Sequence, residues 1–412
     1  MAAGLGLVGI AGYVLVALAG NTLPPAEVAT VTSVYLLLNI LGPGLYVALE
    51  QETNRAVASC AEDAGARGAT VRNAGLVAAG VVAVTIVVLA ASSPLLVSRV
   101  LGGHWSLLAA LMVSTTAAGA LFLVRGTFGG QRRFTAYAAT LGLEGGARLL
   151  PCVLIVVLGV ATATGFGFAF VAGYVVAVLA SLPWTLRWFR GASRAHAVER
   201  PGKLARGVAL LGVATLLSFA VANIAPVVVN ARLPAQPVIA AAFGQAFILA
   251  RAPMLVFAPV QTMLLPGLTN AAERGDTAML RKRIQQIALA VTGVGLPGAL
   301  VAALLGPWLL RLLFGVEQPP SSLVMGLLGL STVLLMAAQA FQPALVAMRR
   351  HQAVTLAWVV GTVLLIGLLA LPIDPVNAAL TAQLVGSAVV VCGCVLGLRS
   401  ELRRRAQPAV VR

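Results

Sequence analysis

The chain has 412 residues, of which 60% are hydrophobic and only 10% are charged, and its mean hydropathy is +0.98. Soluble globular proteins carry about 25% charged residues, so this composition excludes a water-exposed globular fold and predicts a polytopic membrane protein. The formal net charge of +16 does not indicate nucleic-acid binding, because the basic residues occur in short clusters between apolar runs rather than along one face of a domain.

Twelve apolar runs each approach the roughly 20 residues that a helix needs to cross a bilayer. They lie at about residues 3–20, 26–50, 73–97, 105–128, 136–159, 165–186, 207–230, 238–266, 284–313, 321–346, 353–371 and 376–398. Short loops join them, and the alternating segments of about 10 residues that mark a membrane β-barrel are absent. An all-α bundle follows, because a helix satisfies its own backbone groups in lipid.

The basic residues of the loops predict the orientation. Of the 28 Lys and Arg residues, 23 fall in loops on one side or in the C-terminal tail, which predicts that both termini are cytoplasmic in the plasma membrane. The tripeptide Ala17-Leu18-Ala19 resembles a signal-peptidase site, but no basic segment precedes the first run, so we expect this run to remain as a span.

The two halves of the chain resemble each other. The segment PGLYVALEQ at 43–51 aligns with PMLVFAPVQ at 253–261, PLLVSRVLG at 94–102 aligns with PWLLRLLFG at 307–315, and Gln131-Arg132-Arg133 aligns with Met348-Arg349-Arg350. Each pair starts on the same side of the membrane, which predicts a parallel repeat of six plus six spans with the substrate passing between the lobes. The predicted parts are an N-terminal lobe at 1–186, a basic linker at 187–206, a C-terminal lobe at 207–398 and a basic tail at 399–412.

Proline residues interrupt corresponding spans of the two halves. Pro43 lies in span 2 and Pro253 in span 8. Proline removes a helix hydrogen bond and kinks the axis, so paired kinks suggest hinges, although proline is also common in membrane helices. Span 2 then ends in polar groups, at Glu50, Glu52 and Arg55, which are either a solvated helix end or a cytoplasmic gate. Glu52 and Arg55 are three residues apart and can pair on one helix face.

Charges within spans are costly, at least about 2.5–3.5 kcal/mol at a helix centre, and therefore indicate function or a partner. Glu144 and Arg148 in span 5 are four residues apart, so they form either a structural pair or part of a binding site. Arg251 lies in the middle of span 8 with no acid within four residues, and its guanidinium suits phosphate oxygens, so we expect substrate contact there. Arg125, near the cytoplasmic end of span 4, is expected to extend to the interface.

Amide side chains within the spans form a second candidate set, suited either to sugar hydroxyls or to holding helices together. They are Asn223, Asn230, Gln245, Gln261, Gln339 and Gln342. No hydrolytic or redox constellation, phosphate-binding glycine loop or cysteine–histidine ligand set occurs in the sequence, so we expect neither an enzyme nor a cofactor or metal.

The stretch LGPGLYVALEQETNRAVA at 41–58, the twelve spans, the parallel repeat and the basic linker together resemble the polysaccharide and oligosaccharide-lipid flippases of the multidrug/oligosaccharidyl-lipid/polysaccharide (MOP) exporter superfamily, in their actinobacterial branch. The resemblance implies a MATE-like fold with two six-helix lobes around a cavity lined chiefly by spans 1, 2, 7 and 8. It also implies alternating-access transfer of a polyprenyl-pyrophosphate-linked sugar to the outer leaflet, and polysaccharide assembly proteins as partners.

Three alternatives remain at the level of sequence. A cation-coupled multidrug exporter of the same superfamily is the first, although spans 1 and 7 contain no Asp or Glu. A major-facilitator transporter also has six plus six spans, but its basic, glycine-led loop between spans 2 and 3 has no match in AEDAGARGATVR at 61–72. A non-transporting scaffold or a glycan polymerase is the third, and the short external loops count against a polymerase.

Overall fold

The structure is a computed structural model that describes residues 2–60, 63–190, 201–257, 268, 271, 277–348 and 350–406. All secondary structure in this described part is helical, and twelve of its helices are long and apolar enough to cross a membrane. The predicted all-α fold with twelve membrane-spanning helices is therefore confirmed.

The helices follow the apolar runs, and several of them are longer than the runs. Their bounds are α1 (Ala2–Thr22), α2 (Pro25–Asn39), the π-helix η1 (Ile40–Gly44), α3 (Leu45–Ala58), α4 (Ala64–Ala91), α5 (Ser93–Arg99), α6 (Trp105–Gly130), α7 (Phe134–Val157), α8 (Ala163–Arg190), α9 (Pro201–Arg232), α10 (Pro237–Ala250), α12 (Thr277–Phe314), α13 (Ser322–Ala347), α14 (His351–Leu369) and α15 (Pro375–Ala406). The run expected at 73–97 starts earlier, because Asp63 caps α4 through the N–H groups of Gly65 and Ala66. It also ends earlier, since Pro94 opens the separate short helix α5.

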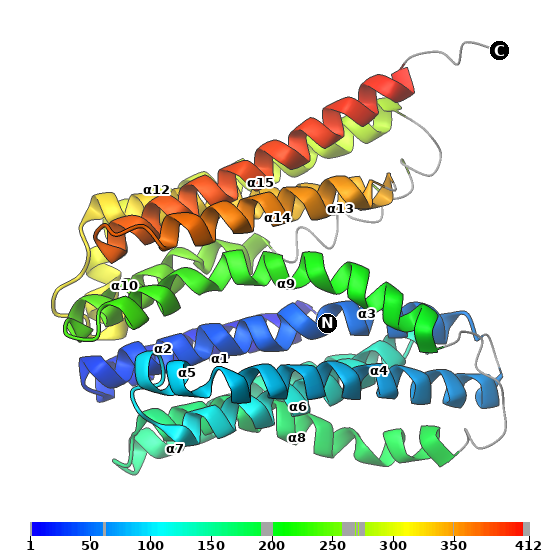
Figure 1. Cartoon of the computed structure of the whole chain (residues 1–412), viewed down its shortest axis with the longest axis horizontal. Coiled ribbons are helices and arrows are strands. Elements are labelled where there is room, and N and C mark those ends of the chain that lie inside the picture. Colours follow the sequence, from blue (N-terminus) through cyan, green and yellow to red (C-terminus); the bar gives the residue numbers. More distant parts are fainter. Residues whose placement is uncertain are drawn as a thin grey trace. The chain divides into compact units, whose positions relative to one another are not determined.

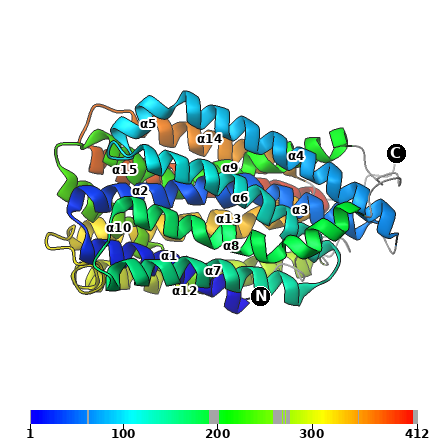
Figure 2. The ribbon, with the colours of Figure 1, turned by 90° about the horizontal axis from the view of Figure 1, so that it is seen from below.

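The described residues divide into two compact units. Unit 1 comprises Met1–Asn223 and Asn230–Ala241, and unit 2 comprises Ile224–Val229 and Ala242–Arg412. Within unit 1, α1 to α8 lie side by side with their axes in similar directions, and within unit 2 the same holds for α12 to α15 (Figures 1 and 2). This division follows compactness, whereas the predicted lobes follow the sequence repeat, and the lobe boundaries remain a prediction.

Backbone hydrogen bonds repeat in the aligned segments 94–102 and 307–315. Gly102 and Gly315 close the two segments, and both adopt positive φ angles, of 59° and 65°. The same unusual bond follows in each half, from the N–H of Gly103 to the carbonyl of Val97 and from the N–H of Val316 to the carbonyl of Leu310. The aligned sequences therefore end their helices in the same way, which supports duplication.

A second aligned pair shows the same correspondence. The N–H of Arg133 donates to the carbonyl of Phe128 at 2.9 Å, and the N–H of Arg350 donates to the carbonyl of Leu345 at 2.9 Å. Bonds that span five residues at a helix end belong to the Schellman type of C-cap. Two unrelated helices need not share this ending, so the repeat extends to the backbone.

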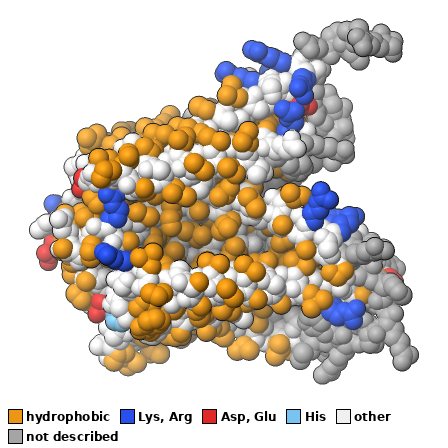
Figure 3. Space-filling view, in the orientation of Figure 1, with side chains coloured by type: hydrophobic (Ala, Val, Ile, Leu, Met, Phe, Trp, Pro, Cys, Tyr) orange, Lys and Arg blue, Asp and Glu red, His pale blue; other side chains and the backbone are white. Residues whose placement is uncertain are grey.

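The surface of each unit fits a lipid environment. Apolar side chains cover the helices along their length, and the visible Lys and Arg side chains gather near helix ends (Figure 3). Lysine and arginine at these positions can reach the lipid headgroups, whereas the apolar flanks contact acyl chains.

Candidate functional site

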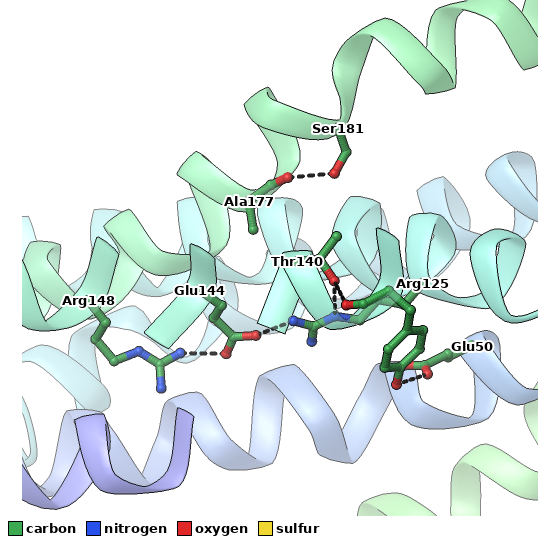
Figure 4. Close-up of polar contacts among 8 residues, drawn as sticks. Glu50, Arg125, Thr140, Glu144, Arg148, Ala177 and Ser181 are labelled. Carbon is green, nitrogen blue, oxygen red and sulfur yellow. Dashed lines mark hydrogen bonds and ion pairs between the residues drawn. The ribbon is translucent and has the colours of Figure 1, made fainter. Parts of the chain in front are cut away.

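A network of buried charges occupies the interior of unit 1. Glu144 of α7 accepts a hydrogen bond from Arg148 at 2.7 Å through one carboxylate oxygen and from Arg125 of α6 at 2.6 Å through the other (Figure 4). All three side chains are at least nine-tenths buried, with residue exposures of 3–4%. The predicted pairing of Glu144 with Arg148 is confirmed, and the carboxylate also holds a second guanidinium.

The expectation that Arg125 extends to the membrane interface is wrong. Its Nε donates to Thr140 Oγ1 at 3.1 Å, in addition to the contact of its terminal nitrogen with Glu144. Both partners lie on α7, one turn apart. An arginine can end either in the headgroup region or on a buried carboxylate, and the carboxylate of the neighbouring helix decides the outcome here.

Glu50 of α3 extends the network. The Tyr137 hydroxyl, from the first turn of α7, donates to Glu50 Oε1 at 2.6 Å (Figure 4). The close approach of α3 to α6 is possible because α6 presents glycine there: a Cβ at Gly126 would lie 2.6 Å from the Glu50 carbonyl oxygen. With Arg125, Arg148 and Glu144, the network gathers two arginines and two glutamates, whose formal charges sum to zero.

Aromatic rings close the other end of the network. The Arg148 guanidinium carbon lies 3.6 Å from the centre of the Phe170 ring and 5.5 Å from that of Tyr174, both on α8. Such cation–π contacts stabilise a desolvated cation by about 2 kcal/mol or more. Phe170 and Tyr174 carry no sequence signal of this role, because only the packing of α8 on α7 brings them to Arg148.

Pro43 lies in the π-helix η1, between α2 and α3. A π-turn contains an extra residue, which accommodates the missing N–H of proline, and such turns are frequent at functional sites. The neighbouring glycines allow close packing: a Cβ at Gly42 would lie 2.6 Å from the Tyr174 hydroxyl, and one at Gly44 would lie 3.0 Å from Phe219 Cβ. The predicted helix break at Pro43 is confirmed, while its role as a hinge stays a prediction.

Pro253 follows a different kind of break in unit 2. Helix α10 ends at Ala250, Arg251 lies in a turn, and helix resumes at residue 252. The bonds at this turn span three residues, from the Arg251 N–H to the Ile248 carbonyl and from the Met254 N–H to the Arg251 carbonyl. The proline ring meets α12 at Gly298, where a Cβ would collide with it.

Arg251 lies at this break with its guanidinium carbon 4.5 Å from the centre of the Phe247 ring. The contact is with a residue one turn earlier on α10, and it leaves the positive charge of the side chain in place. Substrate contact by Arg251 remains a prediction.

The predicted amide ligands have different surroundings. Asn223 donates to the Phe219 carbonyl of its own helix at 2.8 Å, and Gln245, which is buried, donates to the Phe314 carbonyl at the end of α12 at 3.3 Å. Gln261 lies outside the described residues. Gln245 therefore holds two helices together, which was the alternative to sugar binding. Asn223 uses its N–H group within its own helix, and its side-chain oxygen can still accept a hydrogen bond.

The polar end of span 2 separates into two environments. Glu50 is held by Tyr137, whereas Glu52 pairs with Arg55 at 2.7 Å, as expected from their spacing. The Arg55 side chain is 51% exposed, so this pair borders solvent. A Cβ at Gly207 of α9 would lie 2.8 Å from the Glu52 carboxylate, so α9 packs on this end of α3.

No group of three or more His, Cys, Asp or Glu side chains that could hold a metal ion occurs among the described residues.

Comparison with known proteins gives relatives along nearly the whole chain. No protein-family model matches the sequence. The uncharacterized protein Rv1510 of Mycobacterium tuberculosis is 31% identical over 387 residues, which cover 92% of this chain and 85% of the relative. The uncharacterized protein Rv3630 of the same organism is 29% identical over 403 residues, which cover 92% and 86%.

Among solved structures, a multidrug resistance MATE family transporter of the MOP superfamily, in its inward-facing conformation, superposes with a TM-score of 0.75. It is 14% identical, and the match covers 98% of this chain and 96% of the transporter. The chain thus has the MATE transporter fold, and by its similarity to Rv1510 it belongs to the same family as this uncharacterized mycobacterial protein.

Proposed function

We propose that the protein is a membrane transporter that moves a polyprenyl-pyrophosphate-linked oligosaccharide from the cytoplasmic to the outer leaflet, by alternating access, for cell-surface polysaccharide synthesis. The MATE transporter fold supports transport in general. Polysaccharide assembly proteins are the partners that such a substrate requires.

The distribution of charge favours a glycan lipid over a drug coupled to a cation. A cation-coupled exporter needs a membrane carboxylate that can exchange sodium or a proton. Helices α1 and α9 contain no Asp or Glu. In unit 1, Glu144 is shared between two arginines and Glu50 is bound by Tyr137, so these carboxylates already have partners.

Arg251 is the residue that we assign to the pyrophosphate. Its guanidinium carries a positive charge within a membrane span, at a break in α10, and the fork of donors matches phosphate oxygens. We assign Asn223 and Gln261 to sugar hydroxyls. We assign Gln245 to holding α10 against α12, through its bond to the Phe314 carbonyl. Arg148 and Glu144 are sealed in this conformation, so we assign them a place beside the transport path.

The test is to identify the lipid that copurifies with the protein. Native mass spectrometry in mild detergent should find a polyprenyl-pyrophosphate glycan on the wild type that is lost in Arg251→Ala. Arg251→Lys should retain part of it, and Arg311→Ala, which removes an exposed arginine of α12, should retain all of it.

Reconstituted vesicles give the second readout. Flipping of the glycan lipid should fall at least tenfold in Arg251→Ala while the protein stays folded. Full flipping by this variant would contradict the role of Arg251. Bulk phospholipid alone in every sample, together with cation-driven dye export, would favour the multidrug exporter, and no transport of either substrate would favour the scaffold.

A further inference from the structure

One amide joins three distant segments at one end of unit 1. The Asn230 side chain, in the last turn of α9, donates to Ser33 Oγ on α2 at 2.9 Å and to the Val100 carbonyl after α5 at 3.2 Å. Ser33 is 1% exposed and donates in turn to the Ala29 carbonyl. A single side chain therefore fixes the position of α9 against both α2 and the α5–α6 turn.

An apolar cluster lies beside this amide. Val28 and Ala29 at the start of α2 are buried against Ala240 and Ala241 at the start of α10, and two partly buried leucines, Leu23 and Leu233, pack on them. These residues lie in or next to the α1–α2 and α9–α10 turns, both on the side that the loop charges predict to be external. The cluster closes the same end of unit 1 that Asn230 fastens.

The α5–α6 turn completes the closure. Gly102, at a φ of 59°, packs so closely on α2 that a Cβ would lie 2.9 Å from Thr30 Oγ1. The positive φ and the missing side chain are both needed for this approach. Three separate observations thus show that α2 contacts the α5–α6 turn, α9 and α10.

Two other asparagines within spans have a different geometry from that of Asn230. Asn39 donates to the Tyr35 carbonyl and Asn223 to the Phe219 carbonyl, each four residues back on its own helix at 2.8 Å. A local bond of this kind stays intact when helices move apart. The bonds of Asn230 connect helices, so they break if α9 moves away from α2.

We propose that Asn230, with Ser33 and the Val100 carbonyl, is the latch of an external gate, closed in this structure and open when the transporter faces outward. The proposal rests on the alternating-access function given above and deepens it by naming the contact that must break. Hydrogen bonds to neutral groups contribute modestly, so loss of the latch should shift the gate toward the open form by about tenfold rather than unlock it fully.

The experiment measures access to the gate directly. In a background with Cys60, Cys152, Cys392 and Cys394 replaced by alanine, Val28→Cys places a reporter thiol in the apolar cluster, where Val28 is 3% exposed. A membrane-impermeant maleimide added outside intact cells should label this thiol about tenfold faster in Asn230→Asp, which keeps the side-chain shape but has no N–H to donate. Ser33→Ala should raise the rate by a smaller factor.

Asn39→Asp is the matched control, because it makes the same change at an amide whose bond stays within its own helix, and its labelling rate should equal that of the wild type. Equal rates for Asn230→Asp and the wild type would overturn the latch. Labelling only from the cytoplasmic side, in inverted vesicles, would overturn its external position.

The test needs no substrate, so it separates the latch from the proposed function. Faster labelling in Asn230→Asp, in a protein that carries no glycan lipid, would keep the latch and reject the flippase. A bound glycan lipid with unchanged labelling would do the reverse.

Discussion

Arginines within the membrane spans of this protein occur in two contrasting surroundings. Arg125 and Arg148 in unit 1 share the Glu144 carboxylate, and Glu50 balances the remaining charge nearby. Arg251 in unit 2 lies over the Phe247 ring at a helix break. A carboxylate cancels the charge of an arginine, whereas an aromatic face stabilises it and leaves it in place. The first arrangement joins helices through a shared carboxylate, whereas the second sets a guanidinium over a ring of its own helix.

Removing the shared carboxylate should break the first arrangement. Glu144→Leu leaves two buried guanidinium groups without their acceptor, which should lower the free energy of unfolding by about 3–5 kcal/mol. Unfolding in mixed detergent micelles, followed by circular dichroism, measures the loss.

The quadruple variant Arg125→Met, Glu144→Leu, Arg148→Met, Glu50→Gln is the control for that result. Replacing all four charges with neutral side chains of similar size should bring stability back to near the wild-type value. Wild-type stability of Glu144→Leu alone would mean that the network contributes nothing to joining α6 and α7.

The contact between Glu50 and Tyr137 should contribute less to the free energy of unfolding than Glu144 does. Tyr137→Phe removes the donor to Glu50 and leaves a partly buried acceptor, at a cost of about 1–3 kcal/mol. A double-mutant cycle with Glu50→Leu isolates the pairwise energy, since both single variants remove the same contact. Strictly additive losses in the cycle would show that the 2.6 Å contact carries no coupling.

The break beside Arg251 should affect rate more than stability. Pro253→Ala restores an N–H that can donate to the Leu249 carbonyl, so α10 can continue through the break. We expect flipping to slow by at least about threefold, with less than about 1 kcal/mol change in unfolding free energy. Pro43→Ala provides the parallel measurement in unit 1. Transport and stability falling in proportion would argue against a hinge at Pro253.

The exposed ion pair of Glu52 and Arg55 should have the smallest effect on stability. Arg55→Ala removes an ion pair whose arginine is half exposed, so stability should change by no more than about 0.5 kcal/mol. Added salt should weaken the wild-type contribution further. A loss as large as that from Tyr137→Phe would show that Arg55 has a partner beyond Glu52 that matters in the folded state.

Local patterns predicted the features that depend on neighbours in sequence. The 3.6-residue helical repeat puts Glu144 beside Arg148 and Glu52 beside Arg55 wherever a helix forms, and both pairs are present. Pro43 lacks an N–H in any conformation, so a disturbance of the helix there followed from chemistry alone. Composition required a lipid environment and hence a helical bundle.

Packing decided the features that join distant residues. Arg125 lies 19 residues from Glu144 and could equally have reached the interface; the register of α6 against α7 determined its partner. Tyr137 meets Glu50 across 87 residues, and Asn230 meets Ser33 across 197.

The sequence by itself determined the solvent, the helices, their number and the pairs one turn apart, because hydropathy and helix periodicity act over a few residues. Only the tertiary structure decided which charges cancel, which amide crosses between helices and how each proline break is accommodated. These outcomes depend on the rotation and spacing of packed helices, which glycines such as Gly126 and Gly102 set by letting backbones approach.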